Sequence, residues 1–373
     1  MLDKANKVEL LKLDCLGSSL VLEGSMAGWQ QLFLGDALVS QLTATADAEQ
    51  QRTHEFEVQA LAAADAAPTA VRCRLQSTTQ WQPFSFEYQF FINDQLFAEG
   101  KRNTQDIERQ VPQHVAPKTK GFSLLGLGAL GLKLLKSAKL VKVAMAGASL
   151  AAYTWLFSFQ FAFSLIVCLV IHEYGHVRAM QHFGMKTKGI YLIPFFGGAA
   201  LTDDKINTRW QDVVISMMGP CFGLFMSLAC LLAYVISDMP FFAGLAVFNA
   251  FLNLLNLLPI LPMDGGHVLK SISFSMNNKL GILLCAGAAG LGIFVSFSLG
   301  LSLFGFLMVI GCIEIFMEWR TRHNSHLLPL DRYGQIFSGV WYCLLVSSLI
   351  GIIWYFGGSG DEVMRLPLKI LQS

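Results

Sequence analysis

The chain has 373 residues, of which 54% are hydrophobic and only 14% are charged, and its net charge is +1. Soluble domains carry about 25% charged residues, so this composition predicts a membrane protein. The near-zero charge speaks against a nucleic-acid partner, because phosphate binders normally have a basic surplus. The eight cysteines form no CxxC pair and fall mostly in apolar stretches, which favours reduced, structural thiols.

Residues 1–115 are predicted to form a soluble all-β domain. Short segments of alternating polar and apolar residues are separated by Gly, Asp, Asn and Pro, which is the pattern of half-buried strands joined by turns. The segment FLGDAL at 33–38 is similar to FINDQL at 91–96. The similarity could reflect two equivalent hairpins of a duplicated sandwich, or it could be a chance similarity of two turns. The polar start of the chain lacks the apolar core of a signal peptide, so we expect this domain on the cytoplasmic side.

Residues 116–142 are predicted to be a linker followed by a basic interfacial helix. Lys133, Lys136, Lys139 and Lys142 recur every third residue among Leu and Gly, so the lysines would face lipid headgroups and the leucines the acyl chains. The same residues could simply be the basic flank of the first membrane span. Both interpretations place the segment on the cytoplasmic side.

The rest of the chain is predicted to be a polytopic α-helical membrane bundle of about seven spans. Five uncharged runs follow residue 142, at 143–171, 213–237, 239–263, 280–313 and 333–360. The first and the fourth are too long for one span of about 20 residues, so we expect each to be a helical hairpin, turning near 157–159 and near 298–300. With these turns, the Lys- and Arg-bearing connections all fall on the cytoplasmic side, at 183–212, 264–279 and 319–334.

The motif HEYGH at 172–176 lies at the cytoplasmic end of the second predicted span. Residues four apart on a helix share one face about 6 Å apart, so His172 and His176 could bind one Zn²⁺ while Glu173 acts on a water molecule. A carboxylate and two imidazoles within an apolar span are unfavourable unless they meet a metal, a partner or water. The motif therefore predicts a metal site rather than a purely structural polar cluster.

A catalytic zinc normally has three protein ligands, so a further ligand must come from elsewhere in the chain. Asp264 is the main candidate, because the predicted topology brings it to the same depth as His172. Two prolines before it would unwind the helix end, and two glycines after it would allow close approach of the backbone. His267 and His182 are rival third ligands, although interfacial solvation would explain either histidine.

HEYGH at 172–176 and NLLPILPMDG at 256–265 together resemble the HExxH and NxxPxxxxDG motifs of the site-2 protease family of intramembrane metalloproteases. The resemblance covers about residues 143–270 and implies a metalloprotease membrane core there. We expect additional C-terminal transmembrane helices at 271–360 and a short tail at 361–373.

The resemblance implies that His172, His176 and Asp264 bind one zinc ion per chain and that Glu173 is the catalytic base and acid. It also implies that Asn256 lies near the substrate carbonyl or the cleft. From the residues alone, Asn256 is a buried amide, and a helix-packing hydrogen bond would explain it equally well.

The segment 189–201 is an apolar stretch that is interrupted by Pro and Gly-Gly and is too short to span a membrane. It is similar to the membrane-dipping hairpin of the family, whose edge could pair with an unwound substrate. A loop that only packs on the bundle is the alternative. The residues expected to bind substrate are Ile190, Tyr191, Leu192, Gly197 and Gly198. In the third span, Gly219 and Gly223 are expected to allow close packing against the metal-binding helix.

The predicted function is zinc-dependent hydrolysis of peptide bonds within, or at the edge of, transmembrane segments of other proteins. The expected partners are such a substrate and the lipid bilayer. The expected location is a bacterial inner membrane, with the N-terminal domain and the active site toward the cytoplasm. Two alternatives are a membrane zinc carrier, in which the same ligands pass metal through the bundle, and an inactive membrane scaffold.

Overall fold

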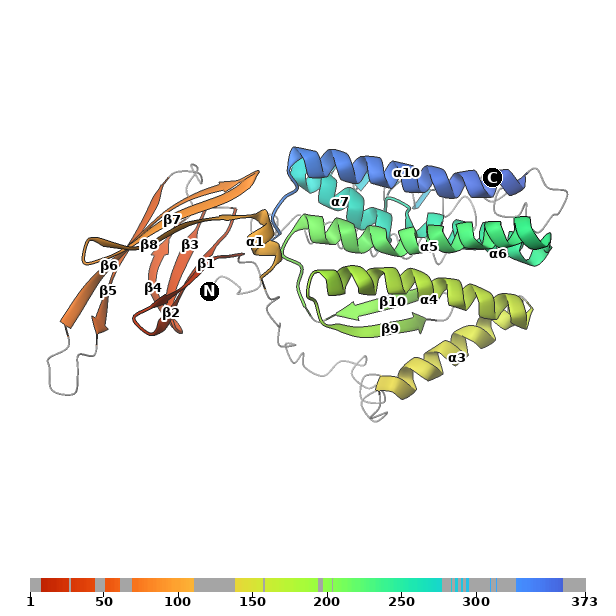
Figure 1. Ribbon diagram of the computed structural model, residues 1–373, viewed down its shortest axis with the longest axis horizontal. Helices are drawn as coiled ribbons and strands as arrows, with labels where there is room; N and C mark the ends of the chain where they lie inside the picture. The colour runs from red at the N-terminus through yellow and green to blue at the C-terminus, as the bar shows by residue number, and fades with distance from the viewer. Residues whose placement is uncertain are drawn as a thin grey trace.

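The computed structural model combines an N-terminal β-sandwich with a bundle of helices, and it describes most but not all of the chain (Figure 1). The described residues are 8–43 without 27, 51–60, 69–110, 138–276 without 157, 194–196 and 203, isolated positions between 277 and 326, and 327–357. The predicted boundary of the β domain near residue 115 and most of the predicted segment 116–142 lie outside these residues, as does the predicted tail.

The β-sandwich consists of two four-stranded antiparallel sheets, each connected as a simple meander. One sheet contains β1 (Val8–Cys15), β2 (Ser18–Gly24), β3 (Gln30–Leu34) and β4 (Ala37–Leu42), and the other contains β5 (Arg52–Ala60), β6 (Thr69–Trp81), β7 (Phe84–Ile92) and β8 (Gln95–Asn103). Alternate residues of these strands face inward and form one core, which includes Leu10, Leu22, Leu32, Leu75 and Phe90. The described strands thus agree with the all-β prediction.

The similar segments at 33–38 and 91–96 form equivalent hairpins in the two sheets. Phe33 pairs with Leu38 in one sheet, and Phe91 pairs with Leu96 in the other. A shift of register directly precedes both pairs, between Leu32 and Phe33 and between Phe90 and Phe91. The shared strand order and the shared irregularity support the hypothesis of a duplicated four-stranded unit.

His54 is a structural group of the sandwich core rather than a ligand. Its Nδ1 lies 2.9 Å from Ser40 Oγ and its Nε2 lies 3.1 Å from Gln30 Oε1. Burial, assisted by the nearby Arg52 charge, lowers the pKa of the imidazole to about 4. The ring is therefore neutral at pH 7, and its two nitrogens tie β5 to the strands of the opposite sheet.

Six described helices make up the second part of the molecule. They are α3 (Ala138–Leu156), α4 (Phe159–His182), α5 (Arg209–Ser237), α6 (Pro240–Asn256), α7 (Asp264–Met276) and α10 (Arg332–Gly357). The helix break predicted near 157–159 occurs there, because α3 ends at Leu156 and Ser158 caps α4 by accepting a hydrogen bond from Phe161 N. Three of these helices, α4, α5 and α10, are long and apolar enough to cross a membrane, and α6 is a shorter apolar helix.

The described residues include only some of the predicted spans, because the fourth uncharged run at 280–313 lies almost entirely outside them. The prediction of seven spans therefore stays a prediction. The described turns do follow the predicted alternation. The turns after α3 and after α5 lie at the end of the bundle away from the β-sandwich, and the connections after α4 and before α10 lie at the end near it (Figure 1).

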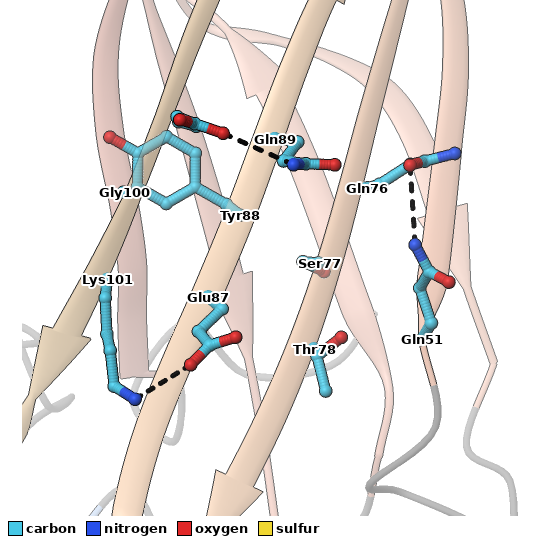
Figure 2. A pocket seen from close by; sticks show the side chains of 10 residues that line it. Gln51, Gln76, Ser77, Thr78, Glu87, Tyr88, Gln89, Gly100 and Lys101 are labelled. Carbon is cyan, nitrogen blue, oxygen red and sulfur yellow. Dashed lines mark hydrogen bonds and ion pairs between the residues drawn. The ribbon is translucent and has the colours of Figure 1, made fainter.

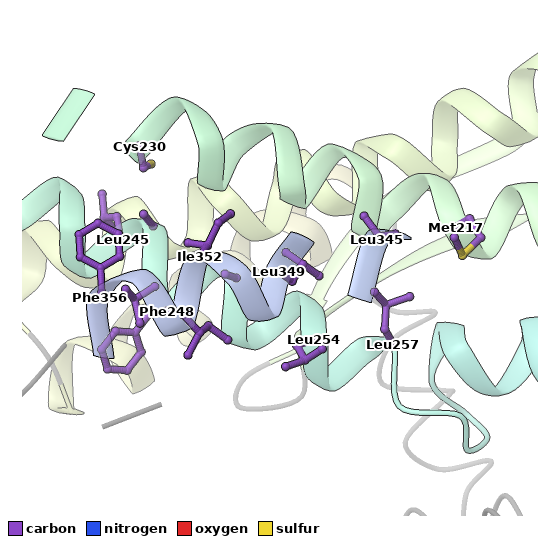
Figure 3. Packing of buried hydrophobic residues seen from close by; sticks show 14 of the residues in the cluster. Met217, Cys230, Leu245, Phe248, Leu254, Leu257, Leu345, Leu349, Ile352 and Phe356 are labelled. Carbon is purple, nitrogen blue, oxygen red and sulfur yellow. The ribbon is translucent and has the colours of Figure 1, made fainter. Parts of the chain in front are cut away.

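Apolar side chains occur both inside the bundle and on its outer surface. Buried residues of α5, α6 and α10 form a continuous core that includes Met217, Phe248, Leu254, Leu349 and Phe356 (Figure 3). Large apolar side chains also point outward from α5 and α10, including Phe225 at 68% exposure and Trp354 at 73%. Such a surface suits contact with acyl chains. Since lipid is as apolar as leucine, specific packing of these helices must come from close fit and polar contacts.

The β-sandwich contacts the bundle through defined hydrogen bonds. The Gln82 side chain, between β6 and β7, donates to Ser275 O at 3.0 Å and to Leu330 O at 2.7 Å. Thr208, which caps α5, forms a parallel bridge with Leu328, and Leu328 is buried in the core cluster of the sandwich. The segment before α10 therefore joins the core of the sandwich to the helices that carry the polar site described next.

Candidate active site

The residues of the HEYGH motif are all buried on α4. His172, Glu173 and His176 have relative exposures of 3%, 4% and 8%, and one ligand atom of each lies within 4.8 Å of the others. The helical spacing of four residues brings the two imidazoles to one face, with 3.1 Å between their Nε2 atoms. Two imidazole nitrogens and a carboxylate thus converge within an apolar helix.

Asp264 brings a second carboxylate to the same point from α7. Its Oδ2 lies 3.4 Å from His172 Nε2 and 3.5 Å from His176 Nε2. Ligands at about 2.0–2.1 Å from a tetrahedral zinc are separated by about 3.3–3.4 Å from one another, so the three distances match the edges of such a site. The donor set of two imidazoles and one carboxylate is also one that catalytic zinc uses. The residues present therefore fit a zinc ion.

The opposite ring nitrogens of both histidines are fixed by oxygen acceptors. His176 Nδ1 donates to the carbonyl of Ile215 at 2.8 Å, and His172 Nδ1 lies 2.7 Å from Asn253 Oδ1. A backbone carbonyl can only accept, so Nδ1 of His176 carries the proton and its Nε2 presents a lone pair. These partners orient both rings toward one point, as outer-shell partners of metal ligands do.

Asn253 is held in place by a chain of amides on α6 that the sequence patterns did not predict. Its Nδ2 donates to Asn249 O at 2.8 Å and lies 3.1 Å from Asn249 Oδ1, which leaves its Oδ1 to accept from His172. Asn249 Nδ2 in turn donates to Gly223 O and Ser227 Oγ on α5, both at 2.8 Å. Asn249 and Asn253 are four residues apart in α6, which is otherwise apolar up to its last residue, Asn256. That spacing could have indicated a pair of interacting amides on one helix face, because buried amides within a span must find hydrogen-bond partners.

Glycines allow α5 to pass directly behind the histidines. A Cβ atom at Gly219 would overlap His176 Nε2 and would lie 2.9 Å from His172 Nε2. A Cβ at Gly223 would overlap the Asn253 amide. The expectation that these two glycines permit close packing against the metal-binding helix therefore agrees with the structure.

A short hairpin covers Glu173. It is formed by β9 (Thr187–Ile193) and β10 (Gly197–Thr202), which pair with each other in an antiparallel two-stranded sheet. The Ala200 backbone amide lies beside the Glu173 carboxylate, and a Cβ atom on Gly198 would lie 2.7 Å from Glu173 Oε1. Within the described residues, no further strand pairs with the other edge of β10.

A cavity of about 470 Å³ opens between α4, β10, α5 and the start of α7. Its lining brings together many of the residues predicted from the sequence: His172, Glu173, His176, Gly198, Asn256 and Asp264. Ile190, Tyr191 and Leu192 lie on β9, are paired with β10, and do not line this cavity. Gly197 is the first residue of β10, where it pairs with Ile193.

The two rival third ligands have other surroundings than Asp264. His267 Nδ1 lies 3.3 Å from Asp212 Oδ1, and His182 is exposed at the end of α4. Among the candidates, the geometry favours Asp264. The glycines that follow it are required, because a Cβ at Gly265 or Gly266 would overlap the backbone of the preceding segment at 257–261.

A second cavity, of about 540 Å³, lies on the β-sandwich and is lined by polar residues of β6, β7 and β8 (Figure 2). Its side chains engage one another: Lys101 Nζ lies 2.8 Å from Glu87 Oε1, and Gln51 and Gln89 donate to Gln76 and Glu99. Its lining contains neither histidine nor cysteine. Although it is larger, its mutually paired side chains offer less chemistry than the cavity at Glu173.

Comparison with known proteins agrees with the geometry of the site on α4. A profile of peptidase family M50 matches residues 160–240 and 239–289, which include every residue of the convergent site. The segment 160–289 is therefore similar to peptidase family M50. Together with the three long apolar helices, this match identifies an integral membrane protein.

Two of three relatives that match part of this chain are named as zinc metalloproteases. A Synechocystis protein named as a candidate zinc metalloprotease is 31% identical over 198 residues, which are 51% of this chain and 46% of that protein. A zinc metalloprotease of Methanocaldococcus jannaschii is 29% identical, with 45% and 50% covered, and stage IV sporulation protein FB of Bacillus subtilis is 27% identical, with 45% and 62% covered. This chain thus spans about half the length of these relatives.

Proposed function

We propose that this chain is a zinc endopeptidase that cleaves peptide bonds within, or at the edge of, transmembrane segments of other membrane proteins. The observation that carries the proposal is the convergence of His172, His176 and Asp264 beside Glu173, in a cavity within an apolar helix bundle. The M50 match and the names of the relatives support the same reaction class. We further propose one zinc per chain, held by those three residues.

The bound zinc would polarise the scissile carbonyl and lower the pKa of water in the site. Glu173 then takes one proton from a water molecule as the water oxygen attacks the carbonyl carbon. When the C–N bond breaks, Glu173 returns this proton to the leaving amine nitrogen. The adjacent Ala200 amide and the close contact with Gly198 hold the Glu173 carboxylate in position for both transfers.

Among the described residues no strand pairs with the other edge of β10, which supports the proposal that substrate binds as an added strand. A peptide bond in a transmembrane helix is shielded by its own hydrogen bonds, so the helix must unwind before attack. Pairing with a strand edge would satisfy the released backbone groups and hold them extended. Because Gly198, Ala199 and Ala200 line the cavity, we place the substrate along β10 rather than β9. Asn256, which also lines the cavity, remains a candidate for contact with the substrate backbone.

The location proposed for the site is the cytoplasmic edge of a bacterial inner membrane. The described parts of the basic connections, 183–193, 204–212 and 327–334, lie at the same end of the bundle as the β-sandwich (Figure 1), and positive charge favours the cytoplasmic side. The β-sandwich would then lie in the cytoplasm next to the active site.

The substitution Glu173→Gln tests the proposed function. Full-length protein in detergent would be assayed with a quenched fluorescent apolar peptide of about 20 residues that carries a Pro–Gly pair. Because a general base contributes about 10²- to 10⁴-fold, cleavage should fall by that factor while zinc, measured by mass spectrometry, stays at the wild-type level. His176→Ala and Asp264→Ala should lose zinc, and His182→Ala, at an exposed position, should keep it.

Three results would contradict parts of the proposal. Equal cleavage by wild type and Glu173→Gln would show that this carboxylate is not the base. Zinc uptake into proteoliposomes that is unchanged by Glu173→Gln, without cleavage, would indicate a carrier. Full zinc in Asp264→Ala combined with zinc loss in His267→Ala would replace the third ligand.

A further inference from the structure

His267 faces the same cavity as the proposed metal ligands but has a different partner. It lies three residues after Asp264 on α7, so the two side chains share one face of the helix about one turn apart. Its side chain is 34% exposed and lines the cavity, together with Glu173 from α4. A substrate carbonyl placed between the metal site and α7 would therefore come within reach of this imidazole.

The orientation of His267 is fixed by a carboxylate. Its Nδ1 lies 3.3 Å from Oδ1 of Asp212 on α5, and the Asp212 side chain is only 12% exposed. The second oxygen of Asp212, Oδ2, accepts a hydrogen bond of 2.6 Å from Ser271 Oγ. Both carboxylate oxygens are thus engaged, which restricts rotation of the carboxylate and of the imidazole that it contacts.

This arrangement gives His267 the character of a hydrogen-bond donor. A carboxylate beside Nδ1 holds a proton on that nitrogen and stabilises the imidazolium. In the imidazolium form Nε2, at the opposite edge of the ring, also carries a proton, and it points away from Asp212. A donor that is fixed in advance is what stabilises charge that develops on a carbonyl oxygen in a low-dielectric site.

We propose that His267 is a further catalytic residue, whose Nε2–H donates a hydrogen bond to the scissile carbonyl oxygen, and that Asp212 is its positioning residue. The inference rests on the proposed peptidase function. The bond changes are those of hydrolysis: the water oxygen bonds to the carbonyl carbon, the C–N bond breaks, and one proton moves through Glu173 to the amine. His267 forms no covalent bond and keeps its proton throughout.

The alternative is an ion pair that only fastens α7 to α5, and kinetics can separate the two. In His267→Ala, kcat should fall by about 10²- to 10³-fold, the effect of removing one oxyanion donor, while KM changes little. Arginine always carries donors, so His267→Arg should retain more activity than His267→Ala. Asp212→Asn should lower kcat by about 10- to 100-fold, the usual effect of losing an outer-shell partner. His182→Gln, at the exposed end of α4, is the matched control.

A second readout does not depend on turnover. A phosphinic tripeptide with apolar side chains imitates the tetrahedral state, and its affinity can be measured by calorimetry on the zinc-loaded protein. His267→Ala should weaken it by the same factor by which kcat falls, whereas the affinity of an unreactive substrate peptide should stay within about threefold, because catalytic interactions are made in the transition state.

The proposal is overturned if His267→Ala loses zinc, since His267 would then be a ligand, or if kcat and phosphinate affinity are both unchanged. If His267→Ala weakened the binding of substrate and of phosphinate to a similar extent, only the structural role of His267, the ion pair that fastens α7 to α5, would remain. If wild type and Glu173→Gln show the same cleavage, the peptidase proposal fails, and phosphinate binding to His267→Ala still tests the donor by itself.

Discussion

At the residue scale, the two histidines proposed as zinc ligands depend on side chains outside the proposed ligand set. Asn253 is 2% exposed and is the acceptor for His172 Nδ1, and its own amide group is held by Asn249. Loss of this acceptor leaves a buried N–H unpaired and allows the imidazole to rotate, and both effects weaken the ligand.

Asn253→Ala should therefore reduce zinc affinity by about 10- to 100-fold, measured by competition with a zinc-binding dye. Asn253→Asp keeps an oxygen that can accept from Nδ1, so it should bind zinc more tightly than Asn253→Ala. If Asn253→Ala bound zinc with wild-type affinity, the Asn253 acceptor would not be needed. The Ile215 carbonyl, which orients His176, and the rest of the site would then be enough to hold zinc.

At the scale of elements, the site requires α5 to pass close behind α4. The helix can do so because small residues face the histidines, and a methyl group at Gly219 would occupy the space of the His176 ring. In a membrane such close packing replaces the hydrophobic drive of a soluble core. The same helix also contributes Asp212 and the Ile215 carbonyl, so its position sets three parts of the site.

Gly219→Ala is expected to abolish stoichiometric zinc binding while the protein remains helical. Gly351→Ala on α10 is the matched control, because a Cβ there meets nothing within 4 Å. Zinc content by mass spectrometry and helicity by circular dichroism would be compared for both. Full zinc in Gly219→Ala would mean that α5 can shift at little cost.

At the scale of the whole molecule, a chain of hydrogen bonds connects the β-sandwich with the cavity. Gln82 donates to Ser275 O, Ser275 Oγ donates to Ser271 O at 2.6 Å, and Ser271 Oγ donates to Asp212. The next side chain is His267. The sandwich thus contacts the C-terminal end of α7, whose first residue is Asp264.

Gln82→Ala should loosen this contact. It removes two part-buried hydrogen bonds at a cost of about 1–3 kcal/mol, although Leu330 O keeps its hydrogen bond from Gln335. Amide hydrogen exchange should become faster at 271–276 and 327–331 but not in α4. Gln41→Ala, on an exposed position of β4, should change neither region. Unchanged exchange in Gln82→Ala would show that Thr208 and Leu328 hold the two parts together by themselves.

Local patterns in the sequence were enough for several features. The spacing of His172 and His176 sets their common helix face, the charge distribution placed a turn where Ser158 caps α4, and alternation predicted the strands before residue 104. These features depend on neighbours within a few residues, where helix and strand geometry leave little freedom. The motif at 256–265 added Asp264 by resemblance.

Other features depended on the tertiary structure. Asp264 and His267 are three residues apart and chemically alike as ligands, and only the packing of α7 on α5 turns one toward the histidines and the other toward Asp212. Asn253 and His172 are 81 residues apart, and Gln82 and Leu330 are 248 apart. The sequence by itself determined which ligand types this protein has and where they recur along a helix. Which of them meet was decided by long-range packing, because contacts between distant segments follow from how whole helices fit rather than from any local pattern.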